Sequence, residues 1–402
     1  MSLDLNQVRS HFPALESGWA FLDNAGGSQV LRSVAERVSD YLLTTSVQAG
    51  ASYDVSQQAT ERLALARSRI ATFVNAVRPE EIVFGPSTTV LMRFLATAMA
   101  SQFSAGDEII LTNFDHESNI GPWLLLQERG VVFKFWEIDP ATLVPDLEQL
   151  SRLMSKRTRL VCVTHVSNIL GSINPIRKIA AQVHAGGARL CVDGVAYAPH
   201  RAIDVQAIDA DYYLFSFYKT YGPHFAMLYG RHEYLLELDG LYHYFYGKNK
   251  VPGKLEPGNP SYELAWGTVG IVDYFEELGG GKGRATIEHA FEAVAAHEVV
   301  IGERLLEWLR KRNDVRIFGM TGSAASDRVP TIAFTIEGKD SLDVVKSIDR
   351  LKIGIRHGDF HSRRLIEALG LAPKGVIRVS MAHYNTVAEI DRLIAGLDQA
   401  LA

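Results

Sequence analysis

Cysteine is scarce in this sequence: only Cys162 and Cys191 occur among 402 residues. Each lies inside an apolar run, "RLVCVTHV" and "ARLCVDGV", where a buried structural thiol is the usual state. Small secreted domains that depend on disulfides need many more cysteines. We therefore expect a reduced chain in a cytoplasmic compartment.

Long apolar runs and blocks of a single charge are also missing. No uncharged run reaches the length of a membrane-spanning helix, and the N-terminal "MSLDLNQVRSHFPALESG" lacks the apolar core of a signal peptide. Lys and Arg are scattered, and the formal net charge is −5. Nothing here indicates nucleic acid or a membrane as a partner, so we expect the ligand to be a small molecule.

Apolar strand-like runs alternate with helix-like segments over the first two-thirds of the chain. The clearest strand patterns are "EEIVFG" (80–85), "DEIILTN", "VVFKFWEI", "TRLVCVTHV", "ARLCVDGV", "DYYLFSFY" and "FAMLYGR". Strands that are apolar throughout and separated by helices indicate a mostly parallel sheet covered on both faces. The sequence therefore predicts an α/β fold.

The pattern changes at 241–262, "LYHYFYGKNKVPGKLEPGNPSY", which is rich in Gly, Pro and aromatic residues and has no periodicity. It predicts a long ordered loop. Helices over 264–278 and about 284–312 follow, and then short strands and helices typical of a smaller α+β domain. We predict a large domain over 18–260 and a small domain over 261–402 that also includes 1–17.

Polar residues stand where several of the predicted strands end. They are Ser87, Thr88, Thr89, His116, Asn168, Asp193 and Lys219. Ligands of open α/β sheets bind beyond the carboxyl ends of the strands. Lys219 lies among aromatic residues, and desolvation there lowers the pKa of an amine and makes it a nucleophile towards aldehydes.

Pyridoxal phosphate is the cofactor that uses such an amine, and it also needs an anion for its ring nitrogen and a cradle for its phosphate. Asp193 in "LCVDGVAY" is the candidate anion, although an aspartate there also fits a turn cap. Residues 85–92, "GPSTTVLM", are the candidate cradle, although Ser and Thr are common helix caps. His116 and Asn168 are ambiguous when taken alone.

Several longer segments, in this order along the chain, resemble one known family. They are "FLDNAGGSQ", "VSQQATERLALAR", "DHESNIGPW", "THVSNILGSINPI", "VDGVAYAPH", "SFYKTYGPH", "LEPGNPSYE" and "IRVSMAHYNT". Together they resemble the class V aminotransferases among fold-type I pyridoxal-phosphate enzymes, and within them the cysteine desulfurase and selenocysteine lyase branch. The resemblance implies a large domain with a mostly parallel seven-stranded sheet between helices, and a smaller α+β C-terminal domain.

The resemblance also assigns roles to individual residues. It implies Lys219 as the Schiff-base lysine, Asp193 as partner of the pyridine nitrogen and His116 stacked on the ring. The other expected cofactor contacts are Ser87, Thr88, Thr89, Asn168, Ser216, Tyr218 and Asn259, the last reaching the phosphate held by a second subunit. The expected substrate-side residues are Asn24, Ala25, Arg356, His361 and Arg378, with Arg378 binding the substrate carboxylate.

The sequence departs from the family pattern at two positions. Ala196 stands where the family has Gln or His, so a ring-hydroxyl contact is missing or comes from a neighbour such as Tyr197. In "GIRHGDFHSRRL" (354–365), His361 stands where desulfurases carry the cysteine that accepts sulfur. We therefore expect no protein persulfide, and His361 is either an additional acid or base or a polar loop residue.

The resemblance implies an enzyme that acts on an amino acid through an external aldimine and removal of the Cα proton. A cysteine desulfurase-like C–S lyase without a protein persulfide is favoured. An aminotransferase and an amino-acid epimerase remain alternatives, as does a non-catalytic dimeric binding protein. The family's sites form between subunits, so a homodimer is expected, and no metal site is expected.

Overall fold

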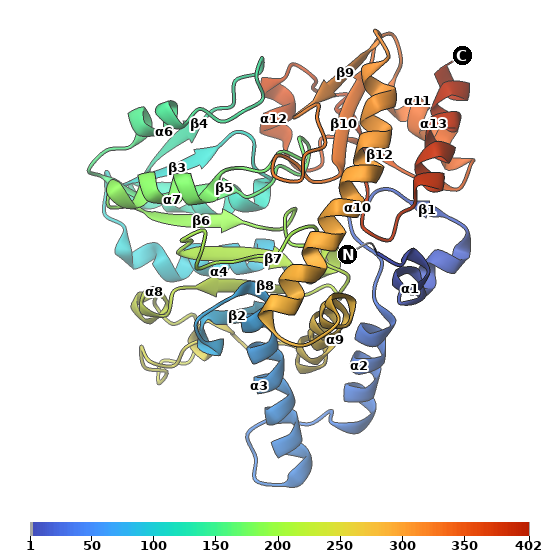
Figure 1. Ribbon diagram of the computed structural model, residues 1–402. Coiled ribbons are helices and arrows are strands. Elements are labelled where there is room, and N and C mark those ends of the chain that lie inside the picture. Colours follow the sequence, from blue (N-terminus) through green and yellow to red (C-terminus); the bar gives the residue numbers. More distant parts are fainter. Residues whose placement is uncertain (1–2, 402) are drawn as a thin grey trace.

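The computed structural model describes residues 3–401, and its larger sheet has seven strands in the order β2–β8–β7–β6–β5–β3–β4 (Figure 1). The strands are β2 (Ile82–Gly85), β3 (Glu108–Thr112), β4 (Val132–Trp136), β5 (Thr158–Thr164), β6 (Arg189–Asp193), β7 (Tyr212–Ser216) and β8 (Ala226–Gly230). Only β8 pairs antiparallel with its neighbours, β2 and β7. The predicted α/β class and the mostly parallel seven-stranded sheet are confirmed.

Both faces of this sheet are buried under helices. In β5, Val161 and Val163 belong to one core, whereas Leu160 and Cys162 belong to the other, because successive side chains of a strand point to opposite faces. The second core is closed by α4 (Thr88–Met99), α5 (Gly121–Leu124) and α8 (His232–Glu237). The first is closed by α3 (Asp54–Val74), α6 (Leu147–Leu153), α7 (Ile176–Ala185) and α9 (Tyr262–Gly279), with α2 (Arg32–Thr44) packed on α9.

A second sheet lies in the C-terminal part of the chain. Its strands are antiparallel, in the order β12 (Arg356–Gly358), β13 (Val376–Ser380), β10 (Thr331–Ile336) and β9 (Val315–Phe318). Helices α11 (Ser341–Asp349) and α13 (Val387–Leu401) cover it, and α12 (Arg363–Ala368) leads into β13. Near the N-terminus, α1 (Leu5–Ser10) is followed by β1 (Ala20–Phe21), which pairs in parallel with β11 (Ile353–Gly354).

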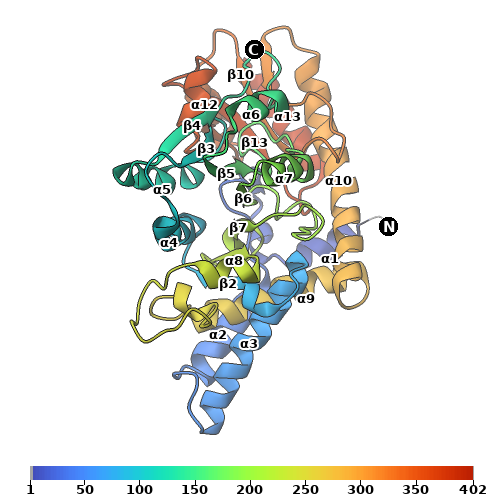
Figure 2. The same cartoon turned by 90° about the vertical axis from the view of Figure 1, so that its left-hand side faces the viewer.

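One long helix, α10 (Arg284–Arg310), connects the two parts and runs along both (Figures 1 and 2). Its first half places Ile287 and Phe291 in the core of the large sheet, and its second half places Ile301 and Leu305 in the C-terminal core. The sequence predicts a domain boundary at residue 260. Helix α9 lies just after that residue and packs on α2 and α3, which belong to the predicted large domain.

The loop predicted over 241–262 contains one short turn of 3₁₀ helix, Gly253–Leu255, before α9 begins. Helices predicted over 264–278 and 284–312 are found at Tyr262–Gly279 and Arg284–Arg310. Within residues 3–401, no helix combines the length and the apolar character needed to cross a bilayer.

Candidate active site

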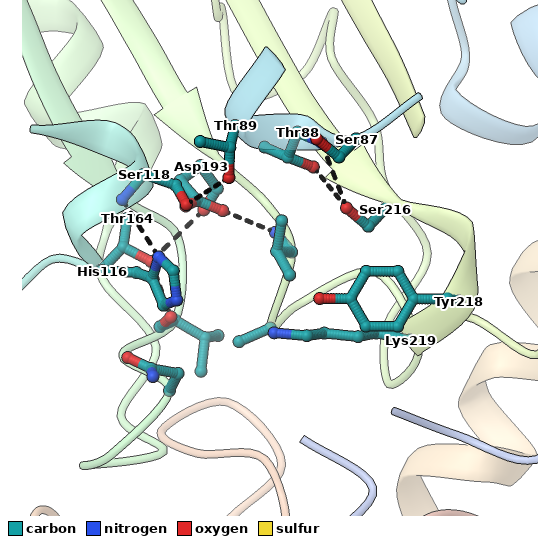
Figure 3. A pocket seen from close by; sticks show the side chains of 14 residues that line it. Ser87, Thr88, Thr89, His116, Ser118, Thr164, Asp193, Ser216, Tyr218 and Lys219 are labelled. Carbon is teal, nitrogen blue, oxygen red and sulfur yellow. Dashed lines mark hydrogen bonds between the residues drawn. The ribbon is translucent and has the colours of Figure 1, made fainter. Parts of the chain in front are cut away.

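Six strands of the large sheet, β2 to β7, end at the same edge, and a cavity lies beyond them (Figure 3). It is partly open to solvent and encloses about 520 Å³ of empty space when the open part is included. β2, β3, β5, β6 and β7 point the same way, so the segments that follow them converge. The cavity is lined by Ser87, Thr88, Thr89, His116, Ser118, Thr164, Val166, Asn168, Asp193, Val195, Ala196, Ser216, Tyr218 and Lys219. The polar strand-end residues predicted from the sequence therefore share one cavity.

Lys219 ends the single 3₁₀ turn that follows β7, and its side chain lies along the cavity beside the Tyr218 ring (Figure 3). Its amine is 5.6 Å from the centre of that ring. Desolvation, reinforced by the positive charge of Arg378 and opposed by Asp193, lowers the Lys219 pKa to about 8. A useful fraction of the amine is thus neutral near pH 7 and can act as a nucleophile or a base.

Asp193 ends β6 and faces the same cavity. Its Oδ1 accepts a hydrogen bond from the Val195 N–H at 2.9 Å, so the turn cap considered from the sequence is present. The carboxylate nevertheless lines the cavity with Lys219, so capping and a site role coexist. Burial raises the Asp193 pKa, and the Val195 N–H and the Lys219 charge oppose that rise. An anion in this place gains from any cation that enters the cavity.

A cluster of hydroxyl groups lies where α4 begins (Figure 3). Ser87 is the N-cap of α4, and its Oγ accepts from the Val90 N–H at 3.2 Å. The Thr88 and Ser216 hydroxyls are 2.6 Å apart, and so are those of Thr89 and Ser118. Hydroxyl donors at the positive end of a helix of 12 residues make a place for an anion such as a phosphate.

His116 lies across the cavity and is neutral. Its Nδ1 accepts from the Ser118 N–H at 3.1 Å, so Nε2 carries the ring proton. Desolvation, with Lys219, His361 and Arg378 nearby, lowers the His116 pKa to about 3. The ring can therefore stack on a planar ligand and donate from Nε2, but it is not charged at neutral pH.

Asn168 lines the cavity, yet its amide is bonded to the C-terminal part of the chain. Its Nδ2 donates to the Phe360 carbonyl at 3.0 Å, and its Oδ1 accepts from the Ser362 hydroxyl at 2.8 Å. Ala196 also lines the cavity, whereas Tyr197 stacks on His165 with ring centres 3.6 Å apart and is not part of the lining. Tyr197 therefore does not replace the ring-hydroxyl contact that the Gln or His of the family makes at the position of Ala196.

Arg378 is buried at the border of the site, outside the cavity lining. Its guanidinium donates to Asp23 at 2.8 Å and to the Asn168 carbonyl at 3.2 Å, and the Phe360 ring covers it with a centroid distance of 3.8 Å. Among the described residues, its buried Nε has no hydrogen-bond partner. A buried donor without an acceptor is costly, and a carboxylate would satisfy it.

The remaining predicted residues lie farther from the cavity. Arg356 is exposed, with its guanidinium 3.8 Å from Asp23. Asn24 is buried and donates to the carbonyls of Phe21 and Ser380, and the Ala25 N–H donates to the Ser380 hydroxyl. Asn259 is exposed and has a left-handed backbone, φ 65°. None of these lines the cavity.

Sequence reasoning missed Ser118, Thr164 and Phe360. Ser118 is two residues from His116, and Thr164 ends β5, so the rule that selected the strand ends also covers them. Phe360 carries no comparable signal, because its place over Arg378 depends on contacts between distant segments. Asp115 was missed too: it is buried beneath the site, and desolvation together with the Asp193 charge raises its pKa strongly.

The lowered pKa of Lys219 predicts how its reactivity depends on pH. The rate of its reductive alkylation by a small aldehyde follows the neutral amine, so we expect an increase of about tenfold between pH 7 and 9 and a plateau above that. Peptide mapping of the labelled protein measures this rate. Peptides with exposed lysines serve as an internal reference, and their labelling rate is expected to keep rising above pH 9. A Lys219 rate that rises in parallel with the reference would contradict the prediction.

The chain is similar to known proteins over its whole length, and a family model described as "Aminotransferase class-V" matches residues 20–393. It is 45% identical to "Aminotransferase-like protein FGM3" of Gibberella zeae, over 100% of this chain and 99% of that protein. It is 35% identical to "Cysteine desulfurase-like protein ustD" of Aspergillus flavus, over 99% of this chain and 90% of that protein. The crystal structure of the cysteine desulfurase CsdA from Escherichia coli matches with a TM-score of 0.86 and 26% identity, covering 100% of this chain and 99% of that chain. The chain therefore belongs to the class V aminotransferase family of pyridoxal-phosphate-dependent enzymes, in its cysteine desulfurase-like branch.

Proposed function

We propose that the cavity at the strand ends binds pyridoxal phosphate and that the protein breaks the C–S bond of a sulfur-containing amino acid. The observation that carries this proposal is the joint presence, in one cavity, of the Lys219 amine, the Asp193 carboxylate and the hydroxyls at the start of α4. These are the amine, the anion and the phosphate cradle that the cofactor requires. When bound, pyridoxal phosphate supplies an aldehyde for amines and a ring that accepts electron density.

The position of each residue in the cavity indicates its role under this proposal. Lys219, with its pKa lowered to about 8, would hold the aldehyde and would then remove the proton from the substrate Cα. Asp193 would keep the ring nitrogen cationic, since burial makes an unpaired carboxylate costly. Thr88, Ser216 and the α4 N-terminus would hold the phosphate. His116 would stack on the ring and could donate from Nε2.

The substrate carboxylate is assigned to Arg378, whose buried Nε has no acceptor within residues 3–401. Arg378→Lys keeps a positive charge but removes the planar fork, so we expect an L-amino acid to bind about tenfold to a hundredfold more weakly. Titration followed by the cofactor absorbance measures this change. A matched amine without a carboxylate is the control, and its affinity is expected to stay the same. An equal loss for both ligands would remove Arg378 from the carboxylate site.

Sulfur is proposed to leave without forming a protein persulfide. Cys162 and Cys191 are both fully buried in neighbouring strands, and burial raises the Cys162 pKa strongly. A persulfide requires an accessible thiolate. His361 replaces the family's cysteine, so sulfur leaves as free sulfide, and the rest of the substrate leaves as pyruvate and ammonia.

The proposal is tested on the purified protein incubated with the cofactor. We expect a yellow protein whose absorbance changes with borohydride, a Lys219→Ala variant without that response, and release of sulfide and pyruvate from L-cysteine. Intact-mass spectrometry after turnover is expected to show no added sulfur. A pyridoxamine product that needs a keto acid would identify an aminotransferase instead, and racemised substrate would identify an epimerase. A protein that takes up no cofactor would support the binding role.

We further propose that the protein is a homodimer whose contact includes the 241–262 loop. Tyr244 is 100% exposed and Phe245 is 66% exposed, which is unusual for adjacent aromatic side chains. Asn259 on the same loop is exposed and outside the cavity of its own chain. Light scattering is expected to give twice the chain mass, and the double variant Tyr244→Asp, Phe245→Asp is expected to shift it towards the monomer. A wild-type monomer that still binds cofactor would contradict this proposal.

A further inference from the structure

A four-residue turn of the C-terminal part, residues 359–362, is fastened to the large sheet beside the cavity. The Phe360 carbonyl accepts from Asn168 at 3.0 Å, and the Ser362 hydroxyl donates to Asn168 at 2.8 Å. The His361 carbonyl accepts from the Glu117 N–H at 2.8 Å. Three hydrogen bonds to two strand-end loops hold this turn in a defined position.

The backbone of the turn is in an uncommon conformation. Phe360 and His361 are consecutive non-glycine residues with positive φ, 52° and 60°. Such residues persist only where surrounding contacts impose them, and they are concentrated at functional sites. Arg364, just beyond the turn, pairs with Glu117 at 3.2 Å and adds a further connection. The turn therefore presents its side chains to the site in a fixed way.

These side chains lie next to Arg378 and His116, the groups assigned to the substrate carboxylate and to the cofactor ring, and outside the cavity lining itself. Phe360 lies on the Arg378 guanidinium, with 3.8 Å from the ring centroid to Cζ. His361, the next residue, has its ring centroid 5.4 Å from that of His116. A substrate whose carboxylate is at Arg378 and whose reacting carbons lie against the His116 side of the site has His361 as a neighbour.

His361 is the one of these two histidines that contacts water, because its side chain is exposed. His116 is half-buried, desolvation lowers its pKa to about 3, and its Nδ1 accepts from the Ser118 N–H. His116 is therefore held neutral, and its Nδ1 is already occupied.

We propose that His361 is the catalytic acid for the leaving group, an inference that rests on the proposed function. As Lys219 takes the Cα proton, the electron pair of that C–H bond forms the second Cα–Cβ bond and the Cβ–S bond breaks. Sulfur keeps the pair of the broken bond and takes the proton of the His361 imidazolium as an S–H bond. Water then recharges the imidazole, and no oxidant or reductant is needed.

The test separates the two proton transfers in the cofactor-loaded enzyme. We expect His361→Ala and His361→Gln to release sulfide from L-cysteine about a hundredfold more slowly, the lower end of what a positioned acid contributes. Exchange of the Cα proton with D₂O is expected to keep its wild-type rate, because Lys219 performs it. When the substrate sulfur carries a nitrophenyl group, the stable nitrophenyl thiolate leaves without being protonated. Cleavage of this substrate is therefore expected to be unaffected in the His361 variants.

His357 provides the matched control, since it lies on β12 four residues before His361. Both histidines lie outside the cavity lining, but within residues 3–401 only the His361 ring lies near that of His116, at 5.4 Å. His357→Ala is expected to behave as wild type in all three assays. Unchanged sulfide release in both His361 variants would overturn the inference, and so would equal losses for cysteine, the nitrophenyl substrate and Cα exchange. If wild type itself binds no cofactor, the proposed function fails, a result distinct from these.

Discussion

The site depends on an amine and a carboxylate that are held in one poorly solvated cavity. Burial acts on both in the direction that removes charge: it lowers the pKa of Lys219 and raises that of Asp193, and each charge only partly offsets the shift of the other. Burial and the Asp193 charge raise the pKa of the buried Asp115 strongly, so a second negative charge near Asp193 is disfavoured. An arrangement of this kind is costly for the protein alone and becomes favourable when a ligand brings a cation to Asp193 and an anion to the α4 N-terminus. The unfavourable burial of these charges therefore supports the proposal that the cavity binds a ligand with both a cationic and an anionic group.

The large sheet supplies this cavity, whereas Arg378, which the proposed function assigns to the substrate carboxylate, belongs to the C-terminal part. Asp23, Asn168 and Arg378 come from three distant segments and are joined by bonds of 2.8 Å and 3.2 Å, with Asn168 and Arg378 buried and Asp23 half-buried. Gly171 shows how tightly the parts approach: its φ is +67°, and a Cβ there would lie 2.1 Å from the Thr331 carbonyl oxygen. Arg378 lies on β13, and the 359–362 turn directly follows β12 of the same sheet, so a displacement of the C-terminal sheet would move both. Helix α10 contributes to both cores and links this sheet to the large one.

Much of the fold and of the cofactor side of the site could be predicted from the sequence, and the reasons are local. Continuous apolar strands require cover on both faces, and parallel strands bring their carboxyl ends to one edge, so Asp193 and Lys219 had to be close. The amide of Asn168 could not be predicted to bond with Phe360 and Ser362, which are 192 and 194 residues away. Likewise, the Asn24 side-chain amide donates hydrogen bonds to the Phe21 and Ser380 carbonyls because β1 joins the C-terminal sheet region. Such contacts follow from how the two parts dock, which no local pattern encodes.

The location of the two thiols limits how sulfur can be handled under the proposed function. Cys162 and Cys191 are paired neighbours in β5 and β6, at the centre of the sheet that positions the cofactor side. Exposing either as a nucleophile would separate the strands that lead to Asn168 and Asp193, so the proposed function assigns the thiols no step. The groups it places near the substrate are an amine, two imidazoles and a guanidinium, which move or stabilise protons and charge but accept no sulfur. Under that proposal C–S cleavage is completed by proton transfers, and the 359–362 turn carries the group assigned to the last of them.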